Sequence, residues 1–283
     1  RKLSMSDVIM HDKKTEEFSV LMSLYCNEKP EFLNQCLISI HEQSVKPNEI
    51  IIVYDGYIPA ELDNVVIEWS KVLPVKVCKL HTNMGLGDAL NFGIKHCNNE
   101  LIARMDTDDI CAKDRFKLQL QYFNENPTLT LIGGGIEEYD EEMQVLRGTR
   151  FTKEKHADIV KYACFKNPFN HMTVMFKKKD IQSVGGYKKH LLMEDYNLWL
   201  RLLNNGYKTY NLPEILVYAR TGINMVRKRR GMSYFKSEIQ LFKLKRMLNC
   251  NSYSKNCVIF LIRVLPRFLP VSVLSIVYKI MRK

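Results

Sequence analysis

Residues 101–109 read Leu-Ile-Ala-Arg-Met-Asp-Thr-Asp-Asp, an apolar run closed by an acidic loop. Leu101–Met105 is typical of a buried strand, and the carboxylates of Asp106, Asp108 and Asp109 follow where that strand should reach the surface. Three carboxylates this close repel one another unless a cation, protons or full solvation intervenes. Oxygen ligands at a strand end suit Mg²⁺ or Mn²⁺. A helix N-cap or a solvated turn is the alternative, but a cap needs only one of the three acids.

The same alternation of strands and helices continues outward from this stretch. Strands are predicted at Ser19–Leu24, Glu49–Tyr54, Val75–Leu80 and Glu100–Met105, with helices near Glu31–Gln43, Ala60–Val72 and Leu86–His96. This pattern predicts an α/β fold with a mostly parallel central sheet covered by helices on both faces. Ligand chemistry is then expected at the carboxyl ends of the strands, where Asp55-Gly56, Asn83-x-Gly85 and Asp106–Asp108 all fall.

The rhythm changes after the acidic loop. We expect a helix from Lys113 to about Asn126, a strand near Leu129–Glu137, further elements at Lys153–Ala163 and Asn167–Lys177, and a helix from Glu194. The predicted organisation is a polar N-terminal segment (1–17), an α/β domain (18–219, with halves 18–110 and 111–219) and a basic, amphipathic C-terminal segment (220–283).

Charge is distributed unevenly along the 283 residues. Residues 220–283 hold fifteen Lys and Arg and a single acid, Glu238, whereas residues 1–219 hold 27 basic and 30 acidic residues. An acidic partner is therefore expected at the C-terminal segment. The eight cysteines form no Cys-x-x-Cys pair and are expected to be reduced thiols of a cytosolic protein. Residues 1–17 are polar and mixed in charge, so no signal peptide is expected there.

The C-terminal tail is apolar with interspersed cations. Arg263, Pro266, Arg267 and Pro270 interrupt it before about 20 apolar residues accumulate, the length that a transmembrane helix needs. A helix pair lying on a membrane surface is therefore favoured over a spanning helix. A C-terminal helix packed on the core is the competing interpretation.

Other motifs carry a structural and a functional interpretation each. The Asn83–Gly93 loop and helix could favour a phosphate or only pack on the sheet, and Asp55-Gly56 could be only a tight turn. Glu194-Asp195 opens an amphipathic helix, either as acids that complement the helix dipole or as a general base. His171 is more often a structural residue than a site residue. The Arg227–Arg230 cluster is either a solvated loop or a grip on a diphosphate.

In this order, the motifs resemble the inverting family 2 glycosyltransferases of the GT-A fold, in particular bacterial enzymes that build O-antigen or capsule repeat units. The resemblance covers the chain from Phe18 to the basic tail. The matching segments are Ser23-Leu24-Tyr25, Asn27-Glu28, Asp55-Gly56, Asn83-x-Gly85-Leu86-Gly87, Ala103–Asp109, Asn167–Phe176 and Met193–Trp199.

The resemblance implies a UDP-sugar donor whose diphosphate is bridged by Mn²⁺ or Mg²⁺ to the Asp-x-Asp motif. It assigns metal binding to Asp106 and Asp108, with Asp106 contacting ribose or metal-bound water, and base catalysis to Asp195 with Glu194 as competitor. It implies that Asp55 recognises uracil and that the nucleotide site also contains Tyr25, Asn27, Glu28, Asn83, Gly85, Arg104 and Asp106. Acceptor or diphosphate binding is expected from His171, Arg220, Arg227, Arg229 and Arg230.

The implied reaction is a single displacement. The metal stabilises the departing UDP while the base deprotonates an acceptor hydroxyl. An α-linked UDP-hexose (UDP-Gal, UDP-Glc or an N-acetyl derivative) would give a β-glycoside on a polyprenyl-diphosphate-linked sugar, at the inner face of the cytoplasmic membrane. Tyr54 and Leu90 depart from the family, at positions where many relatives have an acid and an Arg. The hexose, the acceptor, the linkage and the oligomeric state stay open because pocket shape decides specificity.

Two other classes of protein fit parts of the sequence. A metal-dependent nucleotidyltransferase could share the Asp cluster, but it should have a nucleotide-activating Lys/Arg loop where Leu24–Pro30 supplies Tyr, Asn and Glu. A nucleic-acid-binding module could use the basic C-terminus, yet the apolar Cys257–Leu274 stretch suits lipid better than a duplex. No nucleic-acid partner is therefore expected.

Overall fold

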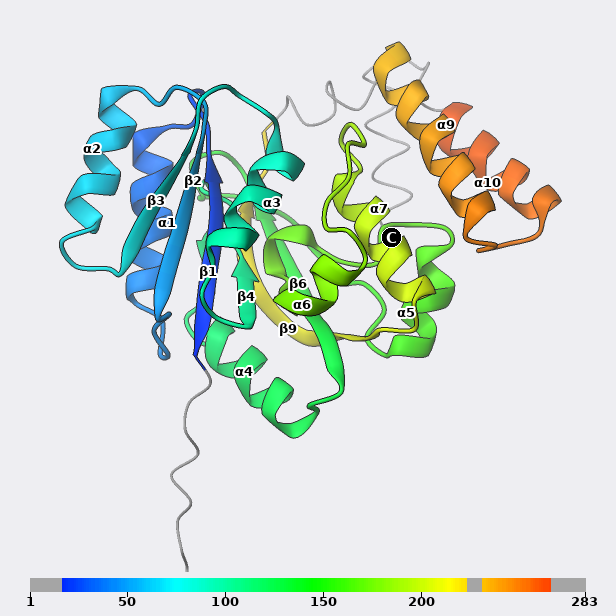
Figure 1. Ribbon diagram of the computed structural model, residues 1–283, viewed down its shortest axis with the longest axis horizontal. Helices are drawn as coiled ribbons and strands as arrows, with labels where there is room; N and C mark the ends of the chain where they lie inside the picture. Colours follow the sequence, from blue (N-terminus) through cyan, green and yellow to red (C-terminus); the bar gives the residue numbers. More distant parts are fainter. Residues whose placement is uncertain (1–16, 223–230, 266–283) are drawn as a thin grey trace, which may run out of the picture.

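The computed structural model describes residues 17–222 and 231–265, which form a sheet flanked by helices and a C-terminal helical hairpin (Figure 1). Within these residues nine strands make one sheet in the order β3-β2-β1-β4-β8-β6-β9-β5, with β7 beside β6. The predicted α/β class is confirmed.

The first four strands of the sheet are parallel, namely β1 (Phe18–Leu24), β2 (Glu49–Asp55), β3 (Val75–Leu80) and β4 (Leu101–Arg104). The connecting helices are α1 (Pro30–His41), α2 (Ala60–Trp69) and α3 (Leu86–His96). Alternate side chains of β1 enter two different cores, since Val20 shares a core with Leu33 of α1, and Leu21 shares one with Leu90 of α3. Both faces of β1, β2 and β4 are buried, which explains why these three strands are nearly continuous apolar runs, whereas the edge strand β3 carries exposed Lys76 and Lys79.

The predicted strands and helices of this half are confirmed, with small differences at their ends. The helix predicted over Ala60–Val72 ends at Trp69, and the strand predicted over Glu100–Met105 is limited to Leu101–Arg104. The acidic loop therefore begins directly beyond β4, at the carboxyl edge of the parallel strands.

The second half extends the same sheet with antiparallel and parallel pairs. Strand β8 (Met175–Lys177) lies antiparallel between β4 and β6 (Leu129–Tyr139), and β9 (Lys208–Arg220) pairs parallel with β6. The remaining strands are β5 (Ile110–Cys111) and β7 (Leu146–Arg150). The helices are α4 (Arg115–Glu125), α5 (His156–Ala163), η1 (His171–Thr173), α6 (Lys178–Ser183) and α7 (Glu194–Asn204).

Strand β9 was not predicted from the sequence, because Pro213 interrupts its strand pattern. Proline cannot donate a hydrogen bond to a strand ladder. The register shifts at this point, since Gly134 pairs with Leu212 but Gly135 pairs with Ile215, so an irregularity accommodates the proline. Through this strand the chain returns to the acidic loop at Arg220.

Helices α9 (Gly231–Met247) and α10 (Tyr253–Val264) form the C-terminal hairpin. Tyr234, Leu241 and Leu244 of α9 belong to the same core as Trp199 of α7, so α9 packs on the α/β domain. The tail considered in the sequence begins at Cys257, so only the later part of α10 belongs to it. Residues 266–283, on which the rest of the tail prediction falls, lie outside the described residues. No helix in the described part of the chain combines the length and apolar character needed to cross a membrane.

Candidate functional site

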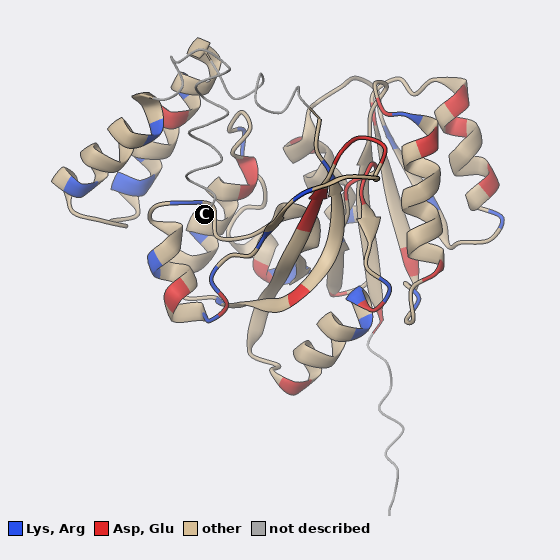
Figure 2. Cartoon of the chain, turned by 180° about the vertical axis from the view of Figure 1, so that it is seen from behind, with Lys and Arg blue, Asp and Glu red and all other residues tan. Residues whose placement is uncertain are grey.

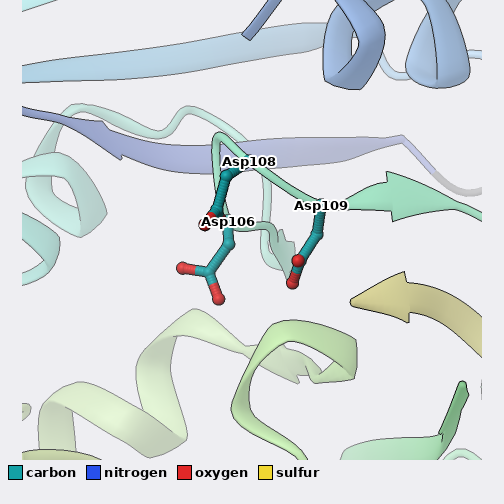
Figure 3. A group of neighbouring side chains, drawn as sticks. All are labelled: Asp106, Asp108 and Asp109. Atoms are coloured by element: carbon teal, nitrogen blue, oxygen red, sulfur yellow. The ribbon is translucent and has the colours of Figure 1, made fainter. Parts of the chain in front are cut away.

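The centre of the site is the acidic loop that follows β4. One carboxylate oxygen each of Asp106, Asp108 and Asp109 lies within 4.8 Å of the others. Figure 3 shows the three side chains projecting to the same side of the loop. Asp109 is buried, and its Oδ1 accepts a hydrogen bond of 2.9 Å from the backbone N–H of Arg220. The cluster is thus built into the fold at the end of the parallel sheet.

The electrostatics of this loop favour a cation. Burial, followed by the charges of Asp106 and Glu28, raises the pKa of Asp108 to about 7. Burial and the charges of Asp108 and Asp106 also raise the pKa of Asp109 well above its usual range. Carboxyl groups in this state gain most from a bound positive charge. A small set of carboxylate oxygens that leaves other positions to water and phosphate suits Mg²⁺ or Mn²⁺, so the residues fit the predicted ion.

Arg104 fixes the first carboxylate of the loop. Its guanidinium donates Nη1–H to Oδ2 of Asp106 at 2.6 Å and Nη2–H to Oδ1 of the same group. Arg104 is only 2% exposed, and the backbone carbonyl of Arg104 accepts a 2.6 Å hydrogen bond from Arg115. This bidentate pair orients Asp106 while its carboxylate oxygens keep further lone pairs for other ligands.

The predicted nucleotide residues after β1 lie beside the acidic loop. Glu28 accepts a hydrogen bond of 2.9 Å from the hydroxyl of Thr107, a residue that the sequence did not single out. Burial and the charges of Glu28 and Asp108 raise the pKa of the partly exposed Tyr25. Asn27 lies in the same turn and is exposed. Sequence separation hides these contacts, because β1 and the acidic loop become neighbours only when β4 pairs with β1.

Asp55 organises the second predicted nucleotide loop. Its Oδ1 accepts a hydrogen bond from the backbone N–H of Met84 at 2.6 Å, and its Oδ2 accepts one from Gly85 at 3.0 Å. Gly85 has a φ of +87°, a conformation that favours glycine. Asn83 lies against the Asp55–Gly56 turn, because a Cβ added to Gly56 would come within 2.7 Å of the backbone nitrogen of Asn83. Asp55 is 4% exposed, and its two hydrogen bonds to the backbone hold the loop that begins α3.

The two candidate bases occupy the first turn of α7. Asp195 accepts hydrogen bonds from the side-chain amide of Asn167 at 2.6 Å and from the backbone N–H of Tyr196 at 2.7 Å. Burial, with a contribution from the charge of Asp195, raises the pKa of Glu194. A Cβ added at Gly87 in α3 would lie 3.4 Å from Cβ of Glu194, so the second predicted nucleotide loop and the two candidate bases border one another.

His171 and Tyr187 connect the two sides of the site. Nε2 of His171 lies 2.7 Å from the hydroxyl of Tyr187, and Asn91 of α3 holds the backbone of Tyr187 with hydrogen bonds of 2.7 and 2.8 Å. Burial, and then the nearby charge of Arg104, lowers the pKa of His171 well below its ordinary value, so the imidazole is neutral. Tyr187 was not among the site residues predicted from the sequence.

Arg220 contacts the acidic loop from the end of β9. Its guanidinium donates hydrogen bonds to the backbone carbonyl of Asp108 and, at 3.0 Å, to that of Glu141, and it sits 4.1 Å above the ring of Phe32. These contacts support the loop, and the predicted role of Arg220 toward a diphosphate stays a prediction. Arg227, Arg229 and Arg230 lie outside the described residues.

Comparison with protein families gives one match over this arrangement. The profile of Glycosyl transferase family 2 matches residues 19–187, which include the nucleotide loops, the acidic loop and Tyr187. The match covers more than half of the chain.

Two curated proteins are similar over nearly their whole length. The chain is 45% identical over 266 residues to the amylovoran biosynthesis glycosyltransferase AmsE of Erwinia amylovora, with 94% of this chain and 99% of that protein covered. It is 37% identical over 265 residues to the UDP-Gal:alpha-D-GlcNAc-diphosphoundecaprenol beta-1,3-galactosyltransferase of Escherichia coli, with 94% and 96% covered.

A solved structure shares the fold at low sequence identity. The mannosyltransferase PcManGT from Pyrobaculum calidifontis, in complex with GDP-Man and Mn²⁺, superposes with a TM-score of 0.63 and 14% identity. The alignment covers 95% of this chain and 81% of PcManGT. The GT-A-like architecture expected from the sequence is confirmed.

Proposed function

Because this chain belongs to glycosyl transferase family 2, we propose that it is a metal-dependent, inverting hexosyltransferase of polysaccharide repeat-unit assembly. The donor is a UDP-hexose and the acceptor is a sugar linked to a polyprenyl diphosphate. One observation carries the proposal: three carboxylates within 4.8 Å of one another stand at the end of β4, and a second acidic pair borders the adjoining donor loop. The name of the Escherichia coli relative supports UDP-Gal and a lipid-linked GlcNAc as the first pair of substrates to test.

Asp106 and Asp108 would hold the metal ion, Mn²⁺ or Mg²⁺. When bound, this ion would supply positive charge to the diphosphate of the departing UDP. Arg104 orients Asp106, and the backbone contacts of Asp109 and Arg220 keep the loop in place. These groups are preorganised, so little reorganisation is needed as the leaving group develops charge.

The nucleotide would lie across the carboxyl ends of β1, β2 and β4. Tyr25, Asn27 and Glu28 would line one side of it, and Asn83 and Gly85 the other. Asp55 keeps the Met84–Gly85 backbone in place and has lone pairs left for a uracil N–H.

Asp195 would take the proton of the acceptor hydroxyl. Its two hydrogen bonds, from Asn167 and from the backbone of Tyr196, fix the orientation of its carboxylate as a positioned base requires. Glu194 is the competing candidate. A direct displacement by the acceptor inverts the anomeric centre, so an α-linked donor yields a β-glycoside without a covalent enzyme intermediate.

His171, Arg220 and the Arg227–Arg230 cluster would contact the acceptor or its diphosphate. We place the enzyme in the cytoplasm, bound peripherally at the inner face of the cytoplasmic membrane, where a polyprenyl-linked acceptor is reached. The transferase domain would span residues 18–219, with a donor half up to residue 110, and residues 220–283 would serve the lipid side.

The test is UDP release from a panel of UDP-sugars with Mn²⁺ and a water-soluble analogue of a diphosphate-linked N-acetylhexosamine. We expect acceptor-dependent release from one donor, lost in Asp108→Ala and reduced about 10²- to 10⁴-fold in kcat in Asp195→Asn. Glu194→Gln should retain more activity than Asp195→Asn. Exposed Glu68→Gln serves as a control. The proposal fails if no UDP-sugar is bound or consumed and both site variants behave like the parent.

A further inference from the structure

The outward face of α10 carries an apolar stripe. Val258, Leu261 and Ile262 of α10 and Leu265 directly after it form this stripe, because the pairs 258/261, 258/262, 261/265 and 262/265 are three or four residues apart, and each side chain is more than half exposed. On the opposite face, Asn256 and Ile259 are buried. A contiguous apolar stripe of this kind marks an interaction site more often than single exposed side chains do.

The hairpin holds this stripe outward through firm internal contacts. Arg263 of α10 donates two hydrogen bonds to Glu238 of α9, at 2.8 and 3.0 Å, and Glu238 is 1% exposed. The ring of Phe242 lies 5.3 Å from that of Phe260 and 6.4 Å from that of Tyr253. The exposed stripe is therefore one side of a packed helix and not a consequence of fraying.

The exposed charges of the hairpin are all positive. Lys236, Lys243, Arg246 and Lys255 are exposed, and Glu238, the one acid between residues 231 and 265, is buried in its ion pair with Arg263. Figure 2 shows Lys and Arg along the hairpin. We propose that this face of the α9–α10 hairpin docks on the surface of an anionic lipid bilayer. Apolar side chains would enter the headgroup boundary while the cations contact lipid phosphates. A second copy of the chain fits less well, because two such faces would bring like charges together.

The hairpin is also fixed relative to the acceptor side of the site. Ser237 donates its hydroxyl to the carbonyl of Leu191 at 2.8 Å, and Gln240 donates its amide to the carbonyl of Lys189 at 2.8 Å. The Nε2–H of His190 donates to the carbonyl of Ser237 at 2.8 Å. This segment leads directly into Glu194 and Asp195, so a bilayer bound by the hairpin would present its lipid-linked acceptor on the side of the proposed base.

The role of this docking, to bring the enzyme to a lipid-linked acceptor, rests on the proposed function. The binding itself can be tested without any sugar substrate. The full chain is floated with vesicles of phosphatidylcholine alone or mixed with phosphatidylglycerol. We expect binding to the anionic vesicles that weakens with salt. Leu261→Gln/Ile262→Gln should bind at least about tenfold less, since it removes two apolar side chains from the interface. Ile67→Gln/Val72→Gln, which changes exposed apolar residues near α2 at the far end of the molecule, should bind like the parent (Figure 1).

Several results would overturn the inference. The first is that the parent does not float with anionic vesicles, and the second is that Leu261→Gln/Ile262→Gln floats as well as the α2 control. The third is that the parent is a dimer which Leu261→Gln/Ile262→Gln converts into a monomer while vesicle binding stays unchanged. If circular dichroism shows that Leu261→Gln/Ile262→Gln does not fold, the Lys243→Gln/Lys255→Gln variant tests the inference instead. Flotation of this variant equal to that of the parent would contradict a charged docking face. Transfer to the water-soluble acceptor without vesicles tests the enzyme separately, so either proposal can fail alone.

Discussion

Arg104 holds Asp106 by two parallel hydrogen bonds, Nη1 to Oδ2 at 2.6 Å and Nη2 to Oδ1. The arginine is buried, whereas the carboxylate side chain is 30% exposed and faces the rest of the acidic cluster. A planar guanidinium can make this pair and an ammonium cannot. The geometry of the proposed metal site thus depends on a buried side chain.

Arg104→Lys should weaken Mn²⁺ binding and lower kcat/KM about tenfold or more, although the positive charge is retained. Lysine cannot orient both oxygens of Asp106. Mn²⁺ titration followed by electron paramagnetic resonance, together with UDP release, measures both effects. The exposed Arg147→Lys is the matched control. Unchanged Mn²⁺ affinity in Arg104→Lys would show that the pair does not position a ligand.

Asp108→Asn should stabilise the metal-free protein and abolish the stabilisation that Mn²⁺ gives to the parent. Burial and neighbouring charges raise the pKa of Asp108 to about 7, so at pH 8 the folded state carries an unfavourable ionised group. Removing that charge should add about 1–3 kcal/mol at pH 8. Thermal denaturation with chelator and with Mn²⁺ tests this, with exposed Glu142→Gln as control. A less stable metal-free Asp108→Asn would contradict the argument.

Asn167→Ala should lower kcat about tenfold and move the acid limb of the kcat–pH profile to higher pH. The amide of Asn167 donates to Asp195 at 2.6 Å, and a hydrogen bond of this kind favours the charged carboxylate. If Asn167→Ala only disturbed the local structure, kcat would fall but the acid limb of the kcat–pH profile would stay in place. Asn64→Ala, at an exposed position of α2, controls for the substitution.

Lys245→Met should flatten the dependence of stability on pH. Burial, then the charge of Arg263, lowers the pKa of Lys245 to about 7, while the unfolded value is 10.5. Between these values the unfolded chain binds more protons, so the parent gains stability as pH rises from 7, by up to about 1.4 kcal/mol per unit. Below pH 7 the full cost of the buried charge remains. Urea denaturation from pH 6.5 to 9 compares Lys245→Met with exposed Lys243→Met, which should keep the parental slope.

Gly93→Ala should destabilise the fold by about 1–3 kcal/mol because it overpacks the contact between α3 and the sheet. A Cβ at this position would lie 2.3 Å from Leu21 and 2.8 Å from Val53, both fully buried. Gly148→Ala meets no atom within 4 Å and should change the free energy of unfolding little. Equal stability of the two variants by urea denaturation would refute the close approach.

The sequence by itself determined the elements of the parallel half and the place of the acidic loop. Strands buried on both faces leave continuous apolar runs, and helices that cover them leave a period of 3.6 residues, so both are readable from neighbouring residues. Asp106, Asp108 and the Glu194–Asp195 pair could be selected because their spacing is local.

Only the tertiary structure decided which of these groups meet. The amide of Asn167 reaches Asp195, the hydroxyl of Tyr187 reaches His171, and the guanidinium of Arg220 reaches a loop 112 residues away. The last contact depends on β9, whose Pro213 hides the strand, and on its register beside β6. Local periodicity encodes which side of an element is buried. The order and register of the strands, which place distant side chains together, are set by pairings that no short stretch of sequence contains.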